Sequence, residues 1–365
     1  MKVPFNYLNY QFRDKKKYFK EWSKLIDSSE FTLGPYVEKF EKLFAKYIGL
    51  KHCISTNNGT DALILSLKSL GVKKGDEVIT VCNSFYASAG AIDACGAKVI
   101  FVDSDNRYQI NIDKLEKAIT KKTKVIMPVH WAGASPNMFK IMRIAKKYKI
   151  KVIEDACMGI GAKISKKSPG SFGSVNAFSM HPLKSLNVMG DGGMIGTDND
   201  EIASWLRKYR NHGMINRDEL SMWGVNARMQ PLQAIVATIQ LKKVDQIIKK
   251  RIKNANFLDK ELSKNKNIQI PLRMKEHRET FALYMANFKQ RDKLKKYLIE
   301  NKIEVKTHYP IPLHLQKPSK KLGYKKGDFP IAEKQAKELL TLPVHQFLNV
   351  DQLKYMVKKI QDFYK

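Results

Sequence analysis

The chain has 365 residues, of which 43% are hydrophobic, so it can build a large core and more than one domain. No apolar run is long enough to cross a membrane, and residues 1–20 lack the apolar segment of a signal peptide. We therefore expect a cytoplasmic protein that does not contact the membrane. The formal net charge is +31, but no basic stripe or nucleic-acid-reading motif accompanies it, so we expect no nucleic-acid partner.

Strands and helices alternate through the first part of the chain. Apolar residues at helical spacing predict helices, and short apolar runs predict strands. In chain order these are a helix at 36–48, a strand at 53–55, a helix at 61–70, a strand at 77–82, a helix at 87–94, a strand at 98–102, a helix at 115–119, a strand at 125–129, a helix at 138–147 and a strand at 152–155. Such alternation predicts an α/β fold with a mostly parallel sheet covered by helices on both faces.

The last third of the chain has a different pattern, typical of a smaller α+β domain. It predicts helices at 241–251, 256–264, 291–300 and 353–364, with strands at 280–287 and 303–307. We therefore divide the chain into a large domain over residues 1–245 and a small C-terminal domain over residues 246–365.

Several familiar catalytic patterns are absent. The sequence has no dinucleotide or P-loop glycine motif, no G-x-S-x-G elbow and no H-E-x-x-H helix. Its four cysteines lie far apart without a Cys/His cluster, so they read as packing thiols and predict no metal site.

Three candidate features stand at strand ends, where an α/β fold binds its ligands. The turn Asn58-Gly59-Thr60 joins a strand to a helix. It is either an ordinary turn capped by Asp61 or a phosphate site built from backbone N–H groups and the Thr60 hydroxyl. The pair Glu154-Asp155 ends another strand, where a carboxylate either caps a helix or holds a proton on a ring nitrogen.

The third feature is Lys184, which follows the apolar run from Ala177 and precedes the glycine-rich segment 190–193. A solvated loop lysine would fit, but a desolvated lysine has a lowered pKa and can form a Schiff base. A phosphate-binding turn, an acid for a ring nitrogen and a Schiff-base lysine are together what pyridoxal phosphate (PLP) needs from a protein.

These residues and the segments around them resemble the DegT/DnrJ/StrS family of sugar aminotransferases, and the resemblance covers nearly the whole sequence. The family has the aspartate-aminotransferase type of fold (fold type I). The matching segments are Phe31-Thr32-Leu33-Gly34-Pro35, Asn58-Gly59-Thr60-Asp61-Ala62-Leu63, Val129-His130 with Gly133, Ile153-Glu154-Asp155-Ala156, residues 179–193, Arg210-Asn211-His212-Gly213, residues 224–229, His308-Tyr309-Pro310 and Leu342-Pro343.

The resemblance implies a role for each matching residue. Gly59 and Thr60 are expected to hold the phosphate of PLP with the help of Ser179, and Phe85 to stack on the pyridine ring. Asp155 and Lys184 are the expected catalytic residues: Asp155 pairs with the ring nitrogen, and Lys184 carries the cofactor and moves the proton. Asn226 is expected to reach the cofactor phosphate of a neighbouring subunit, which implies a homodimer. The residues expected to flank the substrate are Phe31, Leu33, His308 and Tyr309.

Three positions depart from the family pattern. Met158 stands where relatives usually have a Gln or His that bonds the ring hydroxyl of the cofactor, and a thioether is a poor partner for that group. Leu183 and Ser185 replace the usual residues on either side of the lysine, and Trp131-Ala132 replaces the usual Leu-Tyr.

The resemblance implies transfer of an amino group from glutamate to a keto-sugar. The departures favour the branch that aminates C8 of 3-deoxy-octulosonate, for lipopolysaccharide; a nucleotide-linked keto-deoxyhexose is the alternative substrate. A sugar dehydratase would carry His in place of Lys184. A non-catalytic sensor would add a helix-turn-helix segment, which the sequence does not show.

Overall fold

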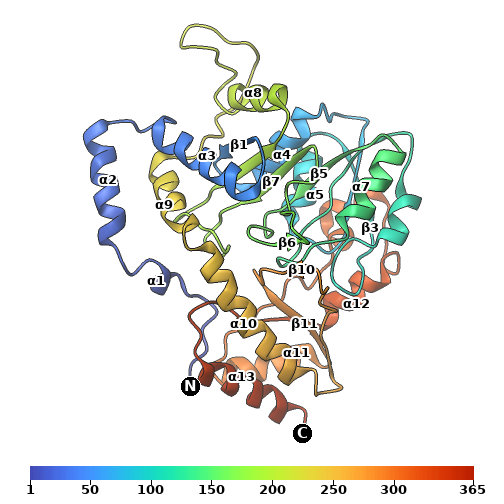
Figure 1. Cartoon of the computed structure of the whole chain (residues 1–365). Helices are drawn as coiled ribbons and strands as arrows, with labels where there is room; N and C mark the ends of the chain where they lie inside the picture. Colours follow the sequence, from blue (N-terminus) through green and yellow to red (C-terminus); the bar gives the residue numbers. More distant parts are fainter.

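The computed structural model describes residues 1–365 and has a larger upper part and a smaller lower part that carries both termini (Figure 1). The larger part contains a seven-stranded sheet with the order β1-β8-β7-β5-β4-β2-β3. Its strands are β1 (His52–Thr56), β2 (Glu77–Val81), β3 (Lys98–Val102), β4 (Thr123–Ile126), β5 (Lys151–Asp155), β7 (Val175–Ser179) and β8 (Gly193–Thr197). All pairs are parallel except those of β8, so the predicted mostly parallel sheet is confirmed.

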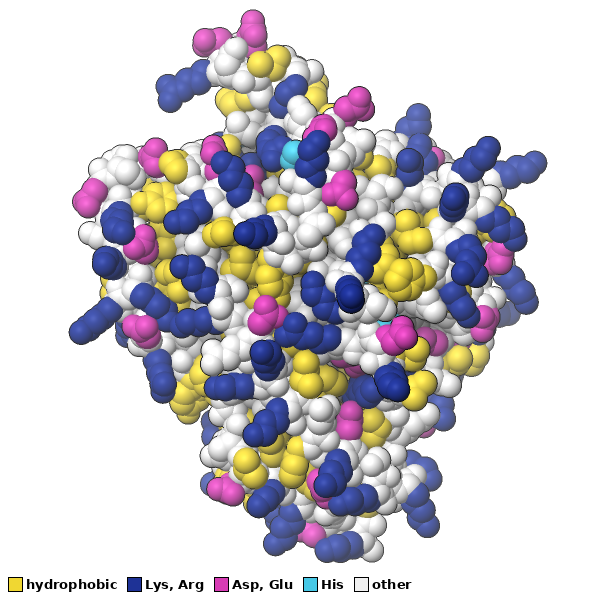
Figure 2. Space-filling model, in the orientation of Figure 1, with side chains coloured by type: hydrophobic (Ala, Val, Ile, Leu, Met, Phe, Trp, Pro, Cys, Tyr) yellow, Lys and Arg dark blue, Asp and Glu magenta, His cyan; other side chains and the backbone are white.

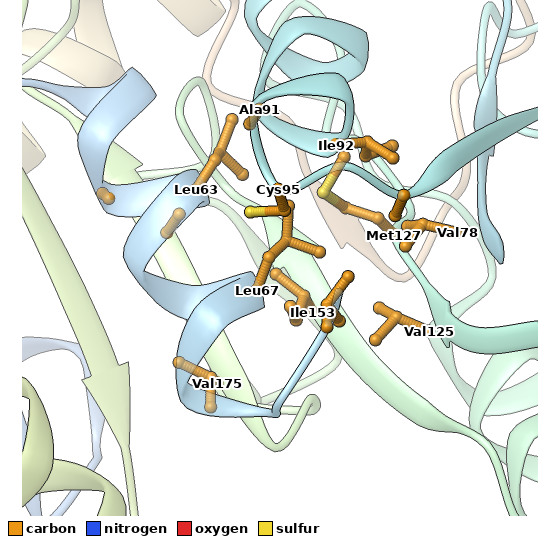
Figure 3. Close-up of a cluster of buried hydrophobic side chains, with 14 of the residues drawn as sticks. Leu63, Leu67, Val78, Ala91, Ile92, Cys95, Val125, Met127, Ile153 and Val175 are labelled. Atoms are coloured by element: carbon orange, nitrogen blue, oxygen red, sulfur yellow. The ribbon is translucent and has the colours of Figure 1, made fainter. Parts of the chain in front are cut away.

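Helices cover this sheet and link its strands. In the larger part they are α2 (Lys16–Ser28), α3 (Pro35–Ile48), α4 (Gly59–Ser69), α5 (Tyr86–Ala94), α7 (Met138–Lys147), α8 (Asp200–Tyr209) and α9 (Pro231–Leu241), with the short α1 (Leu8–Gln11) and α6 (Ile112–Leu115). Figure 3 shows how α4 and α5 build the core: Leu63, Leu67 and Ile92 point towards strand residues such as Val125 and Ile153. All five side chains are at most 1% exposed, so this packing fixes the position of the α4 N-terminus against the sheet.

The smaller part has its own core around an antiparallel sheet of β9 (Ile268–Gln269), β11 (Tyr284–Phe288) and β12 (Leu339–Leu342). Its helices are α10 (Val244–Leu262), α11 (Arg291–Glu300), α12 (Pro330–Glu338) and α13 (Val350–Phe363). A two-stranded ladder of β6 (Lys163–Ile164) and β10 (His277–Arg278) lies between the two parts of the chain. The N-terminal Val3 belongs to this second core and pairs with Ile303, so the first residues of the chain pack on the smaller part. The division at residue 246 stays a prediction.

Several predicted elements differ in the structure. The helix predicted at 115–119 is instead α6 over Ile112–Leu115 followed by a 3-10 helix over Glu116–Ala118, and the strand predicted at 280–287 begins only at Tyr284. The helices predicted at 241–251 and 256–264 form one continuous helix, α10, because residues 252–255 between them include neither Gly nor Pro. The segment 303–307 is not a strand, since only Ile303 and Lys306 form isolated bridges, to Val3 and Thr341. No helix or strand is predicted from the sequence in the segments that form α2, α8, α9, α12, β8 and β12.

Lysine and arginine side chains are scattered over the whole face shown in Figure 2 rather than gathered in one stripe, as their spread along the sequence predicts. None of the helices combines the length and the apolar character that a membrane crossing requires.

Candidate active site

A cavity of about 540 Å³ opens at the carboxyl ends of the parallel strands, where ligands bind in α/β folds. It brings together residues from distant parts of the sequence. Eight of the predicted site residues line it: Gly59, Thr60, Phe85, Asp155, Ser179, Lys184, His308 and Tyr309. The three features singled out at strand ends therefore share one site.

The turn between β1 and α4 forms one wall of the cavity. Asn58 caps α4 by accepting a hydrogen bond from the Asp61 N–H at 2.8 Å, so the capping residue is Asn58 and Asp61 is its partner. A side chain at Gly59 has no room, since its Cβ would lie 2.7 Å from Cβ of Ser179 and 3.1 Å from Sγ of Cys157. The helix N-terminus thus approaches the strand closely with its first N–H groups unpaired in the helix, as a phosphate requires.

Lys184 lies half-buried in the turn that follows β7, where its N–H donates to the His181 carbonyl at 2.9 Å. Burial lowers the pKa of Lys184 below its usual value, and the negative charge of the Asp155 carboxylate opposes this shift. Burial, and next the charge of Asp155, raises the pKa of the Cys157 thiol well above its usual value, so Cys157 stays neutral. The Lys184 amine therefore has the properties of a nucleophile and a base.

The two carboxylates at the end of β5 have different surroundings. Glu154 is fully buried and accepts hydrogen bonds from the backbone N–H groups of Gly170, Phe172 and Gly173 at 2.6–2.8 Å. His130 also contacts Glu154 at 2.8 Å, so Glu154 is a structural residue. Asp155 lines the cavity and accepts a hydrogen bond from the Ser88 hydroxyl at 2.7 Å, which leaves its carboxylate available to a ligand.

Aromatic rings form the outer wall of the cavity. The ring of Tyr309 lies 5.9 Å from Phe85, 5.1 Å from Tyr86 and 5.8 Å from Trp131, measured between centroids. Nδ1 of His308 lies 2.9 Å from the Thr341 hydroxyl. Burial, followed by the charges of Lys306 and Lys184, lowers the pKa of His308 to about 4, so this ring is neutral at pH 7. The flat faces of these aromatic rings can pack against the apolar face of a sugar or against a flat heteroaromatic ring.

Three predicted site residues lie away from the cavity of their own chain. Asn226 is exposed on the segment between α8 and α9 and accepts a hydrogen bond from Arg228 at 3.0 Å. Phe31 is 52% exposed before α3, and Leu33 lines a separate groove beside α3. Their roles at the cofactor and substrate stay predictions, and only Asn226 is expected from the sequence to act on a second copy of the chain.

Phe5 also lines the cavity, and sequence reasoning did not find it. Its position depends on the pairing of Val3 with Ile303, three hundred residues away, which no local pattern reveals. The same holds for Ala282 and Leu283, which enter the cavity from the smaller part.

The sequence matches the DegT/DnrJ/EryC1/StrS aminotransferase family over residues 13–361. The chain belongs to this family. It is 38% identical, over 100% of its length and 99% of the relative, to the pleiotropic regulatory protein of Geobacillus stearothermophilus. It is 36% identical, over 96% of each chain, to dTDP-3-amino-3,6-dideoxy-alpha-D-galactopyranose transaminase of Aneurinibacillus thermoaerophilus.

Solved structures agree with this assignment. The crystal structure of DesV from S. venezuelae superimposes with a TM-score of 0.97 and 31% identity, over 100% of this chain and 99% of that one. The structure of ntda from Bacillus subtilis with bound cofactor PMP gives a TM-score of 0.92 and 30% identity, and the match covers 99% of this chain and 85% of that chain. The chain is thus a PLP-dependent sugar aminotransferase with the expected fold, and the residues predicted to hold PLP within its own chain line one cavity.

Proposed function

We propose that this enzyme transfers an amino group from glutamate to the keto carbon of a nucleotide-linked deoxy-sugar. The observation that carries the amino transfer is the shared cavity of Lys184 and Asp155, closed on one side by the Gly59 turn. The nucleotide-linked substrate rests on the relatives: besides the dTDP-sugar transaminase, UDP-2-acetamido-2-deoxy-3-oxo-D-glucuronate aminotransferase of Pseudomonas aeruginosa is 35% identical over 95% of the chain.

The residues of the cavity divide the work. PLP, when bound, supplies an aldehyde that takes up amino groups and a ring that withdraws electrons. Gly59, Thr60 and Ser179 would hold its phosphate, and Asp155 would keep a proton on its ring nitrogen through a charge-assisted hydrogen bond. The Lys184 amine, with its lowered pKa, would take the proton from the α-carbon of the donor and deliver it to the aldehyde carbon of the cofactor, which is general acid–base catalysis. The aromatic wall excludes water from this exchange.

The octulosonate substrate, favoured from the sequence departures, has less support. It was favoured partly because a sugar acid suits a basic site. Apart from Lys184, however, no lysine or arginine lines the cavity, while Asp61, Asp155 and Asp191 do. The basic residues that give the chain its high net charge therefore do not lie where a sugar carboxylate would bind inside the cavity.

We further propose that two copies of the chain pair and complete each other's sites. The segment between α8 and α9 projects from the molecule beyond α8 (Figure 1). It exposes apolar side chains, with Trp223 88%, Ile215 57% and Leu220 47% exposed, which is unusual for a surface that stays in water. Asn226 on this segment and Phe31 and Leu33 before α3 would then serve the partner's cofactor and substrate.

A single-turnover experiment tests the proposed function. The purified enzyme is loaded with PLP and glutamate, freed of small molecules, and mixed with a dTDP-linked or a UDP-linked 3-keto sugar, or with the 8-keto octulosonate. We expect a stoichiometric amino sugar from a nucleotide-linked substrate and none from octulosonate. Product from octulosonate alone would make octulosonate the substrate. Borohydride treatment of the PLP-loaded enzyme before glutamate is added should label Lys184, and an unlabelled Lys184 would reject the amino-transfer chemistry.

A further inference from the structure

A buried arginine without an acidic partner lies behind the Lys184 turn. Arg251 of α10 is 1% exposed, yet its guanidinium donates to uncharged acceptors. These are Oε1 of Gln346 at 3.2 Å, the Phe281 carbonyl at 3.4 Å and the Tyr7 hydroxyl at 2.6 Å. Burying a charge costs free energy, and here hydrogen bonds to neutral groups are its only compensation. Because an apolar side chain would fill this place at a lower cost, the presence of Arg251 indicates a function beyond packing.

The first branch from Arg251 passes through Tyr7. The phenol oxygen accepts from Nη2 of Arg251, so its single hydrogen is free to point elsewhere. It faces the carbonyl oxygens of Leu183 at 3.5 Å and Lys184 at 3.4 Å. Tyr7 is 3% exposed, so water does not compete for this hydrogen.

The second branch passes through three side-chain amides. Gln346 accepts from Arg251 and donates to Oε1 of Gln11 at 3.0 Å. Gln11 donates in turn to Oδ1 of Asn187 at 3.2 Å. Asn187 then donates to the carbonyl oxygen of Lys184 at 3.0 Å, the same atom that Tyr7 faces.

The direction of both branches is fixed by Arg251, because a guanidinium can only donate hydrogen bonds. Each amide must present its oxygen towards Arg251 and its NH₂ towards Lys184. Gln11, Asn187 and Gln346 are all at most 8% exposed, and chains of buried hydrogen bonds strengthen one another. The two branches form a closed ring that joins the N-terminal segment, α10, the loop around Gln346 and the Lys184 turn.

We propose that Tyr7, Gln11, Arg251 and Gln346 are positioning residues that hold the Lys184 backbone, so that its amine is presented to the cavity at a fixed place. The ring touches the main chain of Lys184 and leaves its side chain free. Through it, the smaller part of the molecule and the N-terminal segment set the geometry of a reaction that takes place in the larger part. This inference rests on the proposed function, in which Lys184 carries the cofactor.

Two substitutions each open one branch, and a third is the matched control. Tyr7→Phe removes the hydroxyl, and Gln11→Met removes the amide while keeping the chain length. Tyr108→Phe is the control: Tyr108 is also 3% exposed and its hydroxyl also makes a partly buried hydrogen bond, at 2.9 Å to Asn287, but it does not line the cavity. All three proteins are loaded with PLP, and kcat, KM for the amino donor, the thermal midpoint and the pH midpoint of the cofactor's visible band are measured.

We expect Tyr7→Phe and Gln11→Met to lower kcat by roughly 10- to 100-fold with little change in KM, since a misplaced catalytic group costs rate rather than binding. The pH midpoint of the visible band should move upward, because a loosened Lys184 turn lets water reach the nitrogen that joins Lys184 to the cofactor, and water favours the protonated, charged form of that nitrogen. Tyr108→Phe should lower the thermal midpoint alone.

Tyr7→Phe and Gln11→Met proteins that lose only thermal stability, with the kcat and band of the wild type, would overturn the proposal. Using two variants on separate branches keeps the test valid if one of them folds poorly. Borohydride links the cofactor covalently to the lysine that holds it, and mapping that lysine separates the positioning hypothesis from the proposed function. A wild-type adduct at Lys184 with unchanged variants rejects the positioning ring alone, whereas no adduct at Lys184 in the wild type rejects the proposed function.

Discussion

Glu154 and Asp155 are neighbours in β5, but the Glu154 carboxylate is enclosed by backbone N–H groups while the Asp155 carboxylate faces the cavity. Successive side chains of a strand point to opposite faces, so one dipeptide supplies a structural acid and a functional one. Glu154 holds the segment 170–173 against the end of the sheet. Asp155 is supported by the Ser88 hydroxyl and lines the same cavity as Lys184.

This difference predicts opposite effects for two conservative substitutions. Asp155→Asn keeps the bond from Ser88 but loses the charge that holds a proton on the cofactor ring, so kcat should fall by roughly 100-fold or more with little change in stability. Glu154→Gln leaves buried donors without their charged acceptor and should cost about 3 kcal/mol of unfolding free energy. Steady-state kinetics and thermal unfolding of both variants test this, and equal losses of kcat in the two would contradict it.

The close approach at Gly59 predicts a specific loss of cofactor affinity. A Cβ at Gly59 would overlap Ser179, so Gly59→Ala should push the α4 N-terminus from the strand and raise the Kd for PLP by roughly 10- to 100-fold. The control is Gly90→Ala in α5, where nothing lies within 4 Å of the new methyl group. Alanine there should add about 0.5–1 kcal/mol of stability and leave the Kd unchanged. Cofactor titration by absorbance measures both, and a matching rise in Kd at Gly90 would point to a general effect.

Local patterns predicted the core of the site because its residues stand next to the strands and helices that place them. Gly59, Asp155 and Ser179 each end or follow an apolar strand, so the alternating pattern alone puts them at one edge of the sheet. Strand β8 was not predicted because Gly193 and Gly196 interrupt its short apolar pattern. It also runs antiparallel to its neighbours, which the alternation of strands and helices does not indicate.

Contacts between distant segments could not be read from the sequence. Phe5 enters the cavity, and Tyr7 and Gln11 reach the Lys184 turn, only because the N-terminal segment pairs with the smaller part more than two hundred residues away. Local periodicity carries no information about such pairs. Likewise, Met158 does line the cavity at the place where relatives usually have a Gln or His that bonds the cofactor. No pattern in the sequence indicates which other group would make that hydrogen bond.

His345 predicts how stability depends on pH. Burial, with a further contribution from Arg251, lowers the pKa of His345 to about 4. Between its ordinary pKa of about 6.5 and 4, the unfolded chain binds this proton and the folded chain does not, so stability falls as the pH falls through this window. Between pH 7.5 and 5 the loss from His345 is about 2 kcal/mol. His345→Gln retains a donor for the Pro4 carbonyl and should lose less stability over that range in thermal unfolding; an unchanged pH dependence would reject this account.

Trp223 provides a direct test of pairing between two copies of the chain. Its side chain is 88% exposed on the projecting segment, and a tryptophan buried in an interface typically contributes 2 kcal/mol or more to binding. We therefore expect Trp223→Ser to raise the dimer Kd by roughly 30-fold or more, measured by sedimentation over a concentration series. Since Asn226 lies on the same segment, the dissociated variant should also lose PLP faster on dialysis.

The control for Trp223→Ser is Phe139→Ser, another substitution of an exposed aromatic residue, 55% exposed on α7. It removes a comparable apolar surface from a helix on a different side of the molecule (Figure 1), so the dimer Kd should stay at the wild-type value. A wild type that sediments as a monomer at all concentrations, yet retains PLP and activity, would contradict the shared site. Asn226 would then have no cofactor within reach, because it lies outside the cavity of its own chain.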